Sequence, residues 1–408
     1  MDRGAIIAVL SMLFYFTSLL GAPGPGAVQP LAAPAEQRTY EVVGQTAQVT
    51  ADAVTVRSAP AADAQALGVL KGDARQVIIL DKDESWYKIR PSSGPIGWVP
   101  AYALRVTPVT PKQLDRIILG YYDPGGPAYE TLLEHSAKLT AAAPLGWNLD
   151  SDGKLRASFD PQEMGRSLYF AGNQELFTFA HVRIPAPPTA LLANAALQKA
   201  SLDTLVATVQ EWGLRGILIH VDYVPTWEQE ELFAFVAALK SKMTAQGRYT
   251  LISLPWAEGL DYAAAGQGAD YLVLQTSAVP AEPGPAAALP AVEEMITTVS
   301  QVVPGERIIL GLSVSGLHWP RGGMVQALSH AEAMGLAARE GAKIRWDTAS
   351  QTPYFQYGNG QEVWFENRYS LKHKLELVAK FNLAGVALAN LGQEDPALWE
   401  TALQLLIG

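Results

Sequence analysis

The stretch LRGILIHVDYVP, Leu214–Pro225, decides the fold because its alternation is typical of a strand in a parallel sheet. One set of alternate residues is apolar and β-branched, which suits packing beneath helices: Ile217, Ile219 and Val221. The other set becomes more polar toward the end of the strand: Leu218, His220 and Asp222. We predict that this second set points into an enclosed lumen. A buried carboxylate at the mouth needs a partner, and a hydrogen-bonded His220–Asp222 pair is the simplest structural interpretation.

Similar strands recur along the chain at helix-sized intervals. Their patterns are RIILGYYD, FTFAHVRI, GILIHVDYV, RYTLISLPW, ADYLVLQTS, RIILGLSVSG and LAGVALANLG. Segments with apolar residues at helical spacing lie between them, such as SLDTLVATVQEWG. Repeated strand–helix units predict an α/β fold, a closed (β/α)8 TIM barrel over residues 114–408. An open doubly wound sheet is the alternative, but no glycine-rich turn follows the first strand to hold a phosphate.

Shorter alternating strands occupy residues 40–107. The motifs VTVRSAP, GVLKGD, SWYKIR and GWVPAYAL follow one another there, with turn residues between them. Strands this short and this evenly spaced predict a small all-β barrel. The ordered motifs resemble a bacterial SH3-like domain over its whole length. That resemblance implies binding of cell-wall peptide or glycan, and the alternative is a spacer or a packing partner for the second domain.

The N-terminus predicts export. MDRG is followed by the uncharged run AIIAVLSMLFYFTSLLGA, and a basic start before an apolar core is typical of a signal peptide. The cleavage site is poor because Leu20 is large and Pro23 follows directly, so residues 1–22 are either a signal peptide or an N-terminal membrane anchor. Residues 23–39, rich in Pro, Ala and Gly, are typical of a linker. Both alternatives predict a secreted protein, extracellular or held in the cell envelope.

Composition excludes several classes of function. The chain has no cysteine, which excludes disulfides, thiolate nucleophiles and cysteine-ligated zinc. Its 30 basic and 40 acidic residues form no basic cluster, so we predict no nucleic-acid partner. The 6 histidines show no metal-ligand spacing, and there is no Gly-x-Ser-x-Gly elbow. We therefore predict no metal, no cofactor and no serine hydrolase.

The barrel region resembles glycoside hydrolase family 18, in its cell-wall and spore-envelope branch. ILGYYD, PGPAAALPAVEEMI, RIILGLSVSGLHW and the run from IRWDTASQTPYFQY to EVWFENRYSLKHKLELVAKFNLAGVALANLGQEDPALW carry this resemblance. It implies a partner containing N-acetylglucosamine, such as peptidoglycan or chitin. It also implies substrate-assisted hydrolysis, in which a Glu protonates the glycosidic oxygen and an Asp holds the substrate's N-acetyl group.

The family motif Asp-x-x-Asp-x-Asp-x-Glu of the fourth strand falls here on Arg215, Leu218, His220 and Asp222. Asp222 stands at the acid position but is shorter than Glu by one methylene, on the order of 1 Å, a displacement that can cost ~100-fold in rate. His220, at the position of the Asp that orients the N-acetyl group, supplies no fixed negative charge. Leu218 removes the carboxylate that tunes its neighbour's proton affinity.

Two other family positions are altered as well. The Met-x-Tyr-Asp of the sixth strand, whose Tyr bonds the N-acetyl group, falls on Gln275, Thr276, Ser277 and Ala278. The Trp of the eighth strand, which forms the floor of the subsite for the reacting sugar, falls on Ala389. Coordinated loss predicts an abandoned hydrolase site, a pseudoenzyme that retains carbohydrate or chitin binding.

Residues at strand ends supply the predicted glycan-binding surface, since flat rings stack on sugar faces. The predicted glycan-binding residues are Tyr121, Tyr223, Trp256, Trp319, Gln275 and Asn390. Tyr122 and Tyr354 are further aromatic candidates, and some of these rings are expected to be packed in the core instead. His318 is expected to line the cleft wall. A rearranged carboxylate pair could come from Asp123, Glu258 or Asp347, although solvated loop acids or helix caps are the ordinary interpretation of such residues.

Three functions stay open at this level. The first is an exported envelope protein that binds N-acetylglucosamine-containing glycan through both domains without hydrolysing it. The second is an active or weakly active glycosidase with Asp222 as general acid. The third is a structural protein of the cell wall or spore coat, whose cleft binds nothing.

Overall fold

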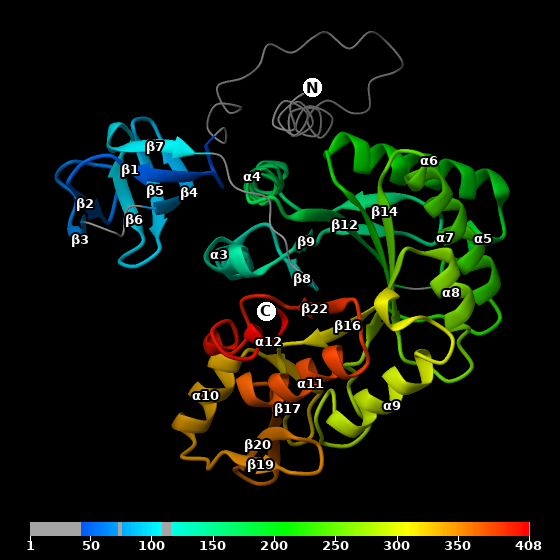
Figure 1. Ribbon diagram of the computed structural model, residues 1–408. Helices are drawn as coiled ribbons and strands as arrows, with labels where there is room; N and C mark the ends of the chain where they lie inside the picture. Colours follow the sequence, from blue (N-terminus) through cyan, green and yellow to red (C-terminus); the bar gives the residue numbers. More distant parts are fainter. Residues whose placement is uncertain (1–41, 72–75, 108–115, 186, 408) are drawn as a thin grey trace. The chain divides into compact units, whose positions relative to one another are not determined.

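The computed structural model describes residues 42–71, 76–107, 116–185 and 187–407. These form two compact units (Figure 1). The first holds the described residues up to 107 together with 159–178 and 210–213, and the second holds the rest of the described chain. The predicted signal peptide or anchor and the predicted linker lie outside the described residues. Within the described ranges, no helix is long and apolar enough to cross a membrane.

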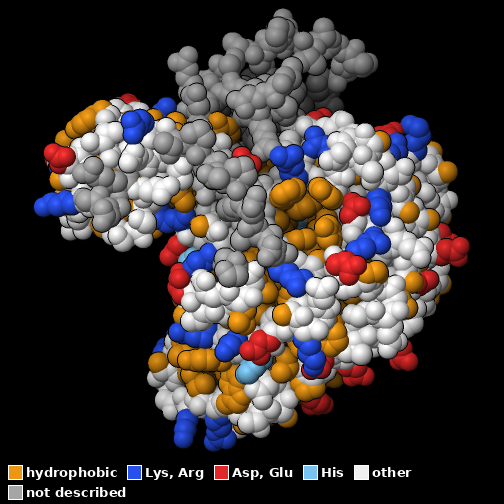
Figure 2. All heavy atoms as spheres, in the orientation of Figure 1, with side chains coloured by type: hydrophobic (Ala, Val, Ile, Leu, Met, Phe, Trp, Pro, Cys, Tyr) orange, Lys and Arg blue, Asp and Glu red, His pale blue; other side chains and the backbone are white. Residues whose placement is uncertain are grey.

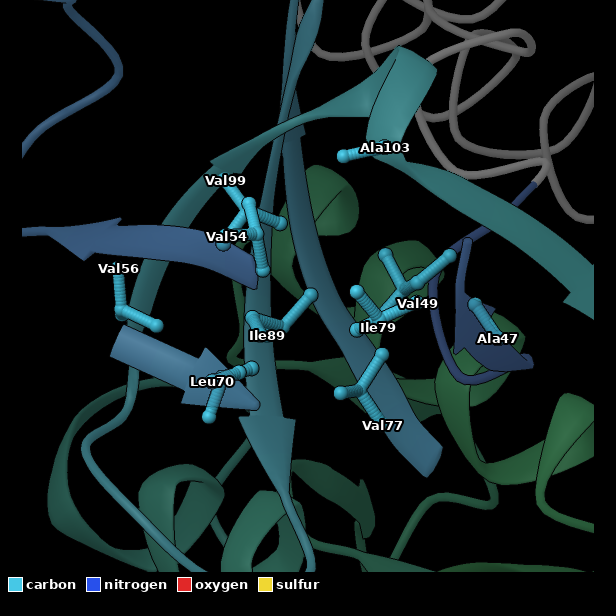
Figure 3. Packing of buried hydrophobic residues seen from close by; sticks show 10 residues of the cluster. All are labelled: Ala47, Val49, Val54, Val56, Leu70, Val77, Ile79, Ile89, Val99 and Ala103. Carbon is cyan, nitrogen blue, oxygen red and sulfur yellow. The ribbon is translucent and has the colours of Figure 1, made fainter. Parts of the chain in front are cut away.

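The first unit contains a seven-stranded antiparallel sheet. Its order is β3 (Ala66–Lys71), β2 (Ala53–Arg57), β6 (Gly97–Pro100), β5 (Trp86–Pro91), β4 (Gln76–Asp83), β1 (Thr46–Val49) and β7 (Leu104–Thr107), with the short helix η1 (Ala101–Ala103) before β7. Alternate side chains such as Val56, Ile79 and Ile89 are fully buried between these strands (Figure 3). The predicted small all-β domain is thus confirmed. Helix α4 (Pro161–Asn173) belongs to the same compact unit.

The second unit is a closed barrel of parallel strands. In order they are β8 (Ile117–Tyr122), β9 (Ala141–Pro144), β12 (Phe177–Ile184), β13 (Gly216–Val221), β14 (Tyr249–Pro255), β15 (Tyr271–Gln275), β16 (Ile308–Ser313) and β22 (Gly385–Ala389). β22 pairs in parallel with β8, and β9 pairs with β12, which closes the ring. The (β/α)8 prediction is confirmed.

Helices follow most of these strands, and α6 to α9 are seen along the outside of the sheet in Figure 1. The bounds are α3 (Gly126–His135), α5 (Thr189–Leu192), α6 (Ala195–Glu211), α7 (Gln229–Thr244), α8 (Tyr262–Gly268), α9 (Leu289–Val299), α11 (Arg368–Lys380) and α12 (Gln404–Ile407). Short elements complete the unit: β10 (Trp147–Leu149), β11 (Leu155–Ala157), η2 (Ser136–Lys138), η3 (Gly305–Arg307) and η4 (Pro396–Leu398).

A second, antiparallel sheet is inserted between β16 and β22, which the strand patterns do not predict. Its order is β18 (Gln326–Leu328), β17 (Gly316–Trp319), β21 (Gln361–Trp364), β20 (Thr352–Tyr357) and β19 (Arg345–Asp347), and α10 (His330–Arg339) lies in the same insertion. Phe355, Val363 and Phe365 form its core.

Apolar side chains fill the lower lumen of the barrel, where Leu119, Leu218, Leu251 and Ile309 are buried together. The packed lumen leaves the carboxyl ends of the strands as the place for polar groups. On the face seen in Figure 2, acidic and basic side chains are interspersed over the described surface.

Candidate functional site

The residues of the quoted stretch rise from the lumen to the mouth on β13, the fourth strand of the barrel. Leu218 is fully buried in the lumen cluster. The side chain of His220 is 20% exposed and that of Asp222 is 27% exposed. Their order agrees with the alternation of the sequence, and Asp222 is the first residue after β13.

Beneath the mouth, three rings from different strands pack together: Tyr121 of β8, His181 of β12 and His220 of β13. The ring centroids lie 5.0 Å apart for Tyr121–His181, 4.8 Å for His181–His220 and 6.3 Å for Tyr121–His220. Burial lowers the pKa of His220 to about 4, although the charge of Asp222 acts in the opposite direction. Burial, followed by the neighbouring His220, also lowers the pKa of His181 well below its usual range. Both imidazoles are therefore neutral at neutral pH.

Tyr121 is a correction to the predicted set of sugar-stacking rings. Its side chain is buried, because His181 and His220 cover the ring in the lumen. Burial raises the pKa of its hydroxyl, and Ser253 only partly offsets this. Tyr122 is also fully buried. Neither ring offers an open face to a sugar.

The carboxylate of Asp222 is bound by Arg183 from the end of β12. Arg183 Nε donates to Oδ1 at 3.1 Å and to Oδ2 at 2.9 Å, and Nη2 donates to Oδ2 at 2.5 Å. The Nε2 atom of His220 lies 3.5 Å from Oδ1, so the predicted His220–Asp222 pair is the lesser contact. Hydrogen bonding to Asp222 raises the pKa of the Arg183 guanidinium. A bidentate guanidinium binds the ionised form of a carboxylate, whereas a general acid must carry a proton.

Sequence reasoning did not single out Arg183 or His181. The signal was present in FTFAHVRI, since alternation places Phe179, His181 and Arg183 on one face of β12. The missing information was register: Arg183 lies directly beside His220 when β12 pairs with β13.

Hydroxyl and amide groups occupy the opposite side of the mouth. We call Ser277, Ser313, Ser315 and Asn390 the serine–asparagine cluster. Asn390 Nδ2 donates to the hydroxyls of Ser313 and Ser315, each at 3.2 Å, and these hydroxyls lie 2.8 Å apart. Ser277 Oγ accepts from the backbone N–H of Ser313 at 3.1 Å. Asn390 has a φ of 65°, a left-handed conformation that Asn tolerates better than most residues.

Gln275 links this cluster's side of the barrel to β13. Its Nε2 atom donates to Ser253 Oγ at 3.0 Å and to the carbonyl oxygen of Val221 at 3.2 Å. The structure therefore brings Gln275, Ser277 and Asn390 to the strand ends, where they bond protein groups.

Aromatic side chains flank the mouth in the loops after β13 and β14. Tyr223 is 56% exposed and Trp227 is 75% exposed. Trp256 is half-buried and stacks on Tyr262, with ring centroids 5.8 Å apart. The Tyr262 hydroxyl fixes this loop, because it donates to the carbonyl of Pro255 and accepts from the N–H of Ala257, each at 2.9 Å. Trp227 was missed by the sequence analysis because it lies five residues beyond Asp222, outside the strand pattern.

The insertion carries the remaining predicted aromatic residues. Trp319 lies on β17 and is half-buried. His318, on the opposite face of that strand, hydrogen-bonds the Tyr357 hydroxyl through Nε2 at 2.8 Å. This bond joins His318 to β20, and its place in the cleft wall stays a prediction. Tyr354 stacks on Trp364 with centroids 4.5 Å apart, so one face of its ring is covered.

The remaining candidate acids serve local turns or face solvent. Asp123 Oδ1 accepts from the N–H of Gly125 at 3.1 Å. Asp347 Oδ2 accepts from the N–H and the hydroxyl of Ser350, bonds that lower the pKa of Asp347. Glu258 is exposed. No group of three or more His, Asp or Glu residues in the described chain could hold a metal ion.

A parallel barrel whose polar residues gather at the carboxyl ends of its strands defines a protein of the TIM-barrel class, with its site at the mouth. The chain belongs to the glycosyl hydrolases family 18, whose model matches residues 189–394, half of the chain. The bacterial SH3 domain model matches residues 52–105. Both resemblances inferred from the sequence are confirmed.

Similar proteins include enzymes of spores and chitinases. The chain is 26% identical over 238 residues to the cortical fragment-lytic enzyme of Bacillus subtilis, a match that covers 51% of this chain and 54% of that protein. The chain thus spans about half the length of the curated relatives that it matches. A chitinase structure from Chromobacterium violaceum has a TM-score of 0.65 and 26% identity, covering 71% of this chain and 98% of that one. The spore cortex-lytic enzyme of Bacillus megaterium has a TM-score of 0.64 at 24% identity, covering 76% and 78%, and this likeness is one of fold.

Proposed function

We propose that the protein is an exported envelope protein that binds N-acetylglucosamine-containing glycan, peptidoglycan or a chitin-like polymer, and does not hydrolyse it. The SH3-like domain and the barrel mouth both take part in binding. The single observation that carries the proposal is the ion pair at the acid position, where Arg183 binds both oxygens of Asp222.

This ion pair opposes hydrolysis for a chemical reason. The acid must deliver a proton to the glycosidic oxygen, but both oxygens of Asp222 already accept hydrogen bonds from the Arg183 guanidinium. The helper positions do not compensate. His220 is neutral and Leu218 is apolar, so neither provides the negative charge that a substrate-derived cation requires. Ser277 is too short to replace a tyrosine that reaches the N-acetyl group.

Binding is supported by what the mouth retains. The serine–asparagine cluster and Gln275 present hydroxyl and amide groups, and the loops beside the mouth expose Tyr223 and Trp227. Sugars are recognised by this combination of hydrogen-bonding groups and flat rings. The names of the relatives, a cortical fragment-lytic enzyme and a chitinase, suggest the class of polymer.

Binding is tested by sedimenting the full chain with purified peptidoglycan and with chitin. The double variant Tyr223→Ala/Trp227→Ala should weaken binding about tenfold, the effect of roughly 1.4 kcal/mol lost from two stacking rings. Tyr102→Ala, an 86% exposed ring of the SH3-like domain, measures the contribution of that domain. Tyr249→Ala, 42% exposed at the opposite end of the barrel, is the control. If the native chain binds neither polymer, the result would instead support a structural role.

The glycosidase alternative depends on Asp222, which is partly exposed at the acid position. Reducing ends released from N-acetylglucosamine oligomers measure hydrolysis by the native chain, Asp222→Ala and Asp222→Glu. We expect equal background rates for all three, because Arg183 can still bind a glutamate and the helper positions stay altered. Release that Asp222→Ala abolishes, or substantial turnover from Asp222→Glu alone, would contradict the proposal.

A further inference from the structure

The charges of the mouth differ from those of the family motif. Asp222 follows β13 directly and is paired with Arg183, while Asp123 after β8 and Glu258 in the loop after β14 are exposed acids. Two positions of the motif on β13, Leu218 and His220, hold an apolar and a neutral group. At the end of β13, a ligand that carries a negative charge would therefore meet the Asp222 carboxylate already paired with Arg183.

Arg183 has a second set of donors that Asp222 does not use. The carboxylate occupies the edge formed by Nε and Nη2. The Nη1 atom has no hydrogen-bond acceptor among the described residues, and the side chain is 53% exposed. A guanidinium has five N–H donors, so the edge formed by Nη1 and the second N–H of Nη2 stays open. Two parallel N–H groups of this kind match the two oxygens of a carboxylate.

Asp222 fixes the direction of that open edge. Its two oxygens hold the guanidinium from one side, and His220 lies beside it, so the Arg183 side chain has a defined orientation at the mouth. A group held in place before binding loses less conformational freedom when the ligand arrives. The Arg183–Asp222 pair thus places an open guanidinium edge of fixed orientation at the position that the family motif gives to its acid.

We infer that the barrel mouth selects glycans bearing a free carboxylate, which Arg183 binds through its Nη1–Nη2 edge while Asp222 positions it. This inference rests on the proposed glycan binding and specifies the substrate class of the same site. The chemistry is that of an acidic sugar, whether the carboxylate belongs to a lactyl ether or to a uronic acid.

Calorimetric titration of the full chain with oligosaccharides of equal length tests the selection. The neutral probe is an N-acetylglucosamine oligomer. The acidic probes are peptidoglycan strands freed of their peptides, which carry lactyl carboxylates, and an oligogalacturonate. We expect at least one acidic probe to bind about tenfold or more tightly than the neutral one, with an affinity that falls as salt is raised. Which acidic probe binds identifies the source of the carboxylate.

Variants test whether Arg183 causes the preference for acidic glycans. Arg183→Gln should abolish the preference for the acidic probes, whereas Asp222→Asn should preserve or strengthen acidic binding because it frees the guanidinium charge. Lys242→Gln makes the same charge change in the exposed last turn of α7, at the opposite end of the barrel from the mouth, and should have no effect. If Arg183→Gln unfolds because Asp222 loses its partner, the double variant Arg183→Gln/Asp222→Asn removes both charges and should show the same loss of preference.

The outcomes separate this inference from the proposed function. Equal affinities for neutral and acidic probes, or a preference that survives in Arg183→Gln and in the double variant, overturn the selection and leave glycan binding standing. Failure of every probe and both polymers to bind the native chain overturns the proposed function as well.

Discussion

Two ion pairs of the barrel unit have similar chemistry and opposite surroundings. Lys374 of α11 pairs with Glu366, and their side chains are 0% and 4% exposed. Arg183 pairs with Asp222 at the mouth, where the side chains are 53% and 27% exposed. Glu366 also accepts a hydrogen bond from the buried hydroxyl of Ser370 at 2.6 Å, so the inner pair is closed by protein groups.

This difference indicates what each pair can do. A buried pair is costly to break, because the charge that remains has neither its partner nor water to stabilise it. An exposed pair contributes little to stability, because water can replace the lost partner. The inner pair is therefore expected to act on the fold, and the mouth pair on ligands.

Breaking the inner pair should have the largest effect. Lys374→Met leaves the Glu366 carboxylate buried without its cation, and we expect the free energy of unfolding to fall by about 3–5 kcal/mol. Urea unfolding of the full chain measures this. The double variant Lys374→Met/Glu366→Gln should recover most of the loss, since it removes both charges. A single variant as stable as the native chain would remove the distinction between the two pairs.

The histidines beneath the mouth should have the next largest effect on the free energy of unfolding, because their protonation makes it depend on pH. The pKa of His220 is about 4 in the folded chain, below its ordinary value of 6.5. Between these values the unfolded chain binds more protons, so the free energy of unfolding falls as pH is lowered from 6.5 to 4, by about 3 kcal/mol for this group. His181 acts in the same direction.

Urea unfolding at several pH values measures the slope. His220→Gln should flatten this slope between pH 6.5 and pH 4. An equal slope in His220→Gln and the native chain would mean that the imidazole is not kept neutral by burial.

Much of this fold could be predicted from the sequence, because long apolar strands separated by amphipathic helices have few alternatives. The position of Asp222 at the mouth followed from alternation along one strand. Its partner did not, because Arg183 belongs to another strand and only the register of β12 against β13 brings the two together. Register between parallel strands separated by helices leaves no local signal in either strand.

The burial of Tyr121 and the inserted sheet were missed for related reasons. A ring at a strand end can be exposed or covered, and the covering side chains come from β12 and β13. The strands of the insertion are three to six residues long, too short for alternation to distinguish them from turns. Contacts between distant segments, rather than local patterns, decided both features.

The mouth pair should give the smallest effect on stability. Arg183→Gln removes a cation whose side chain is 53% exposed, and Asp222 is then hydrated, so we expect the free energy of unfolding to change by less than about 1 kcal/mol. The same urea experiment measures it beside Lys374→Met. Asp222→Asn, which removes the other charge, should change stability equally little, because its amide oxygen still accepts from Arg183. A loss of several kcal/mol from either variant would mean that the mouth pair holds the barrel together, and the difference between the two pairs would then lie in exposure alone and not in role.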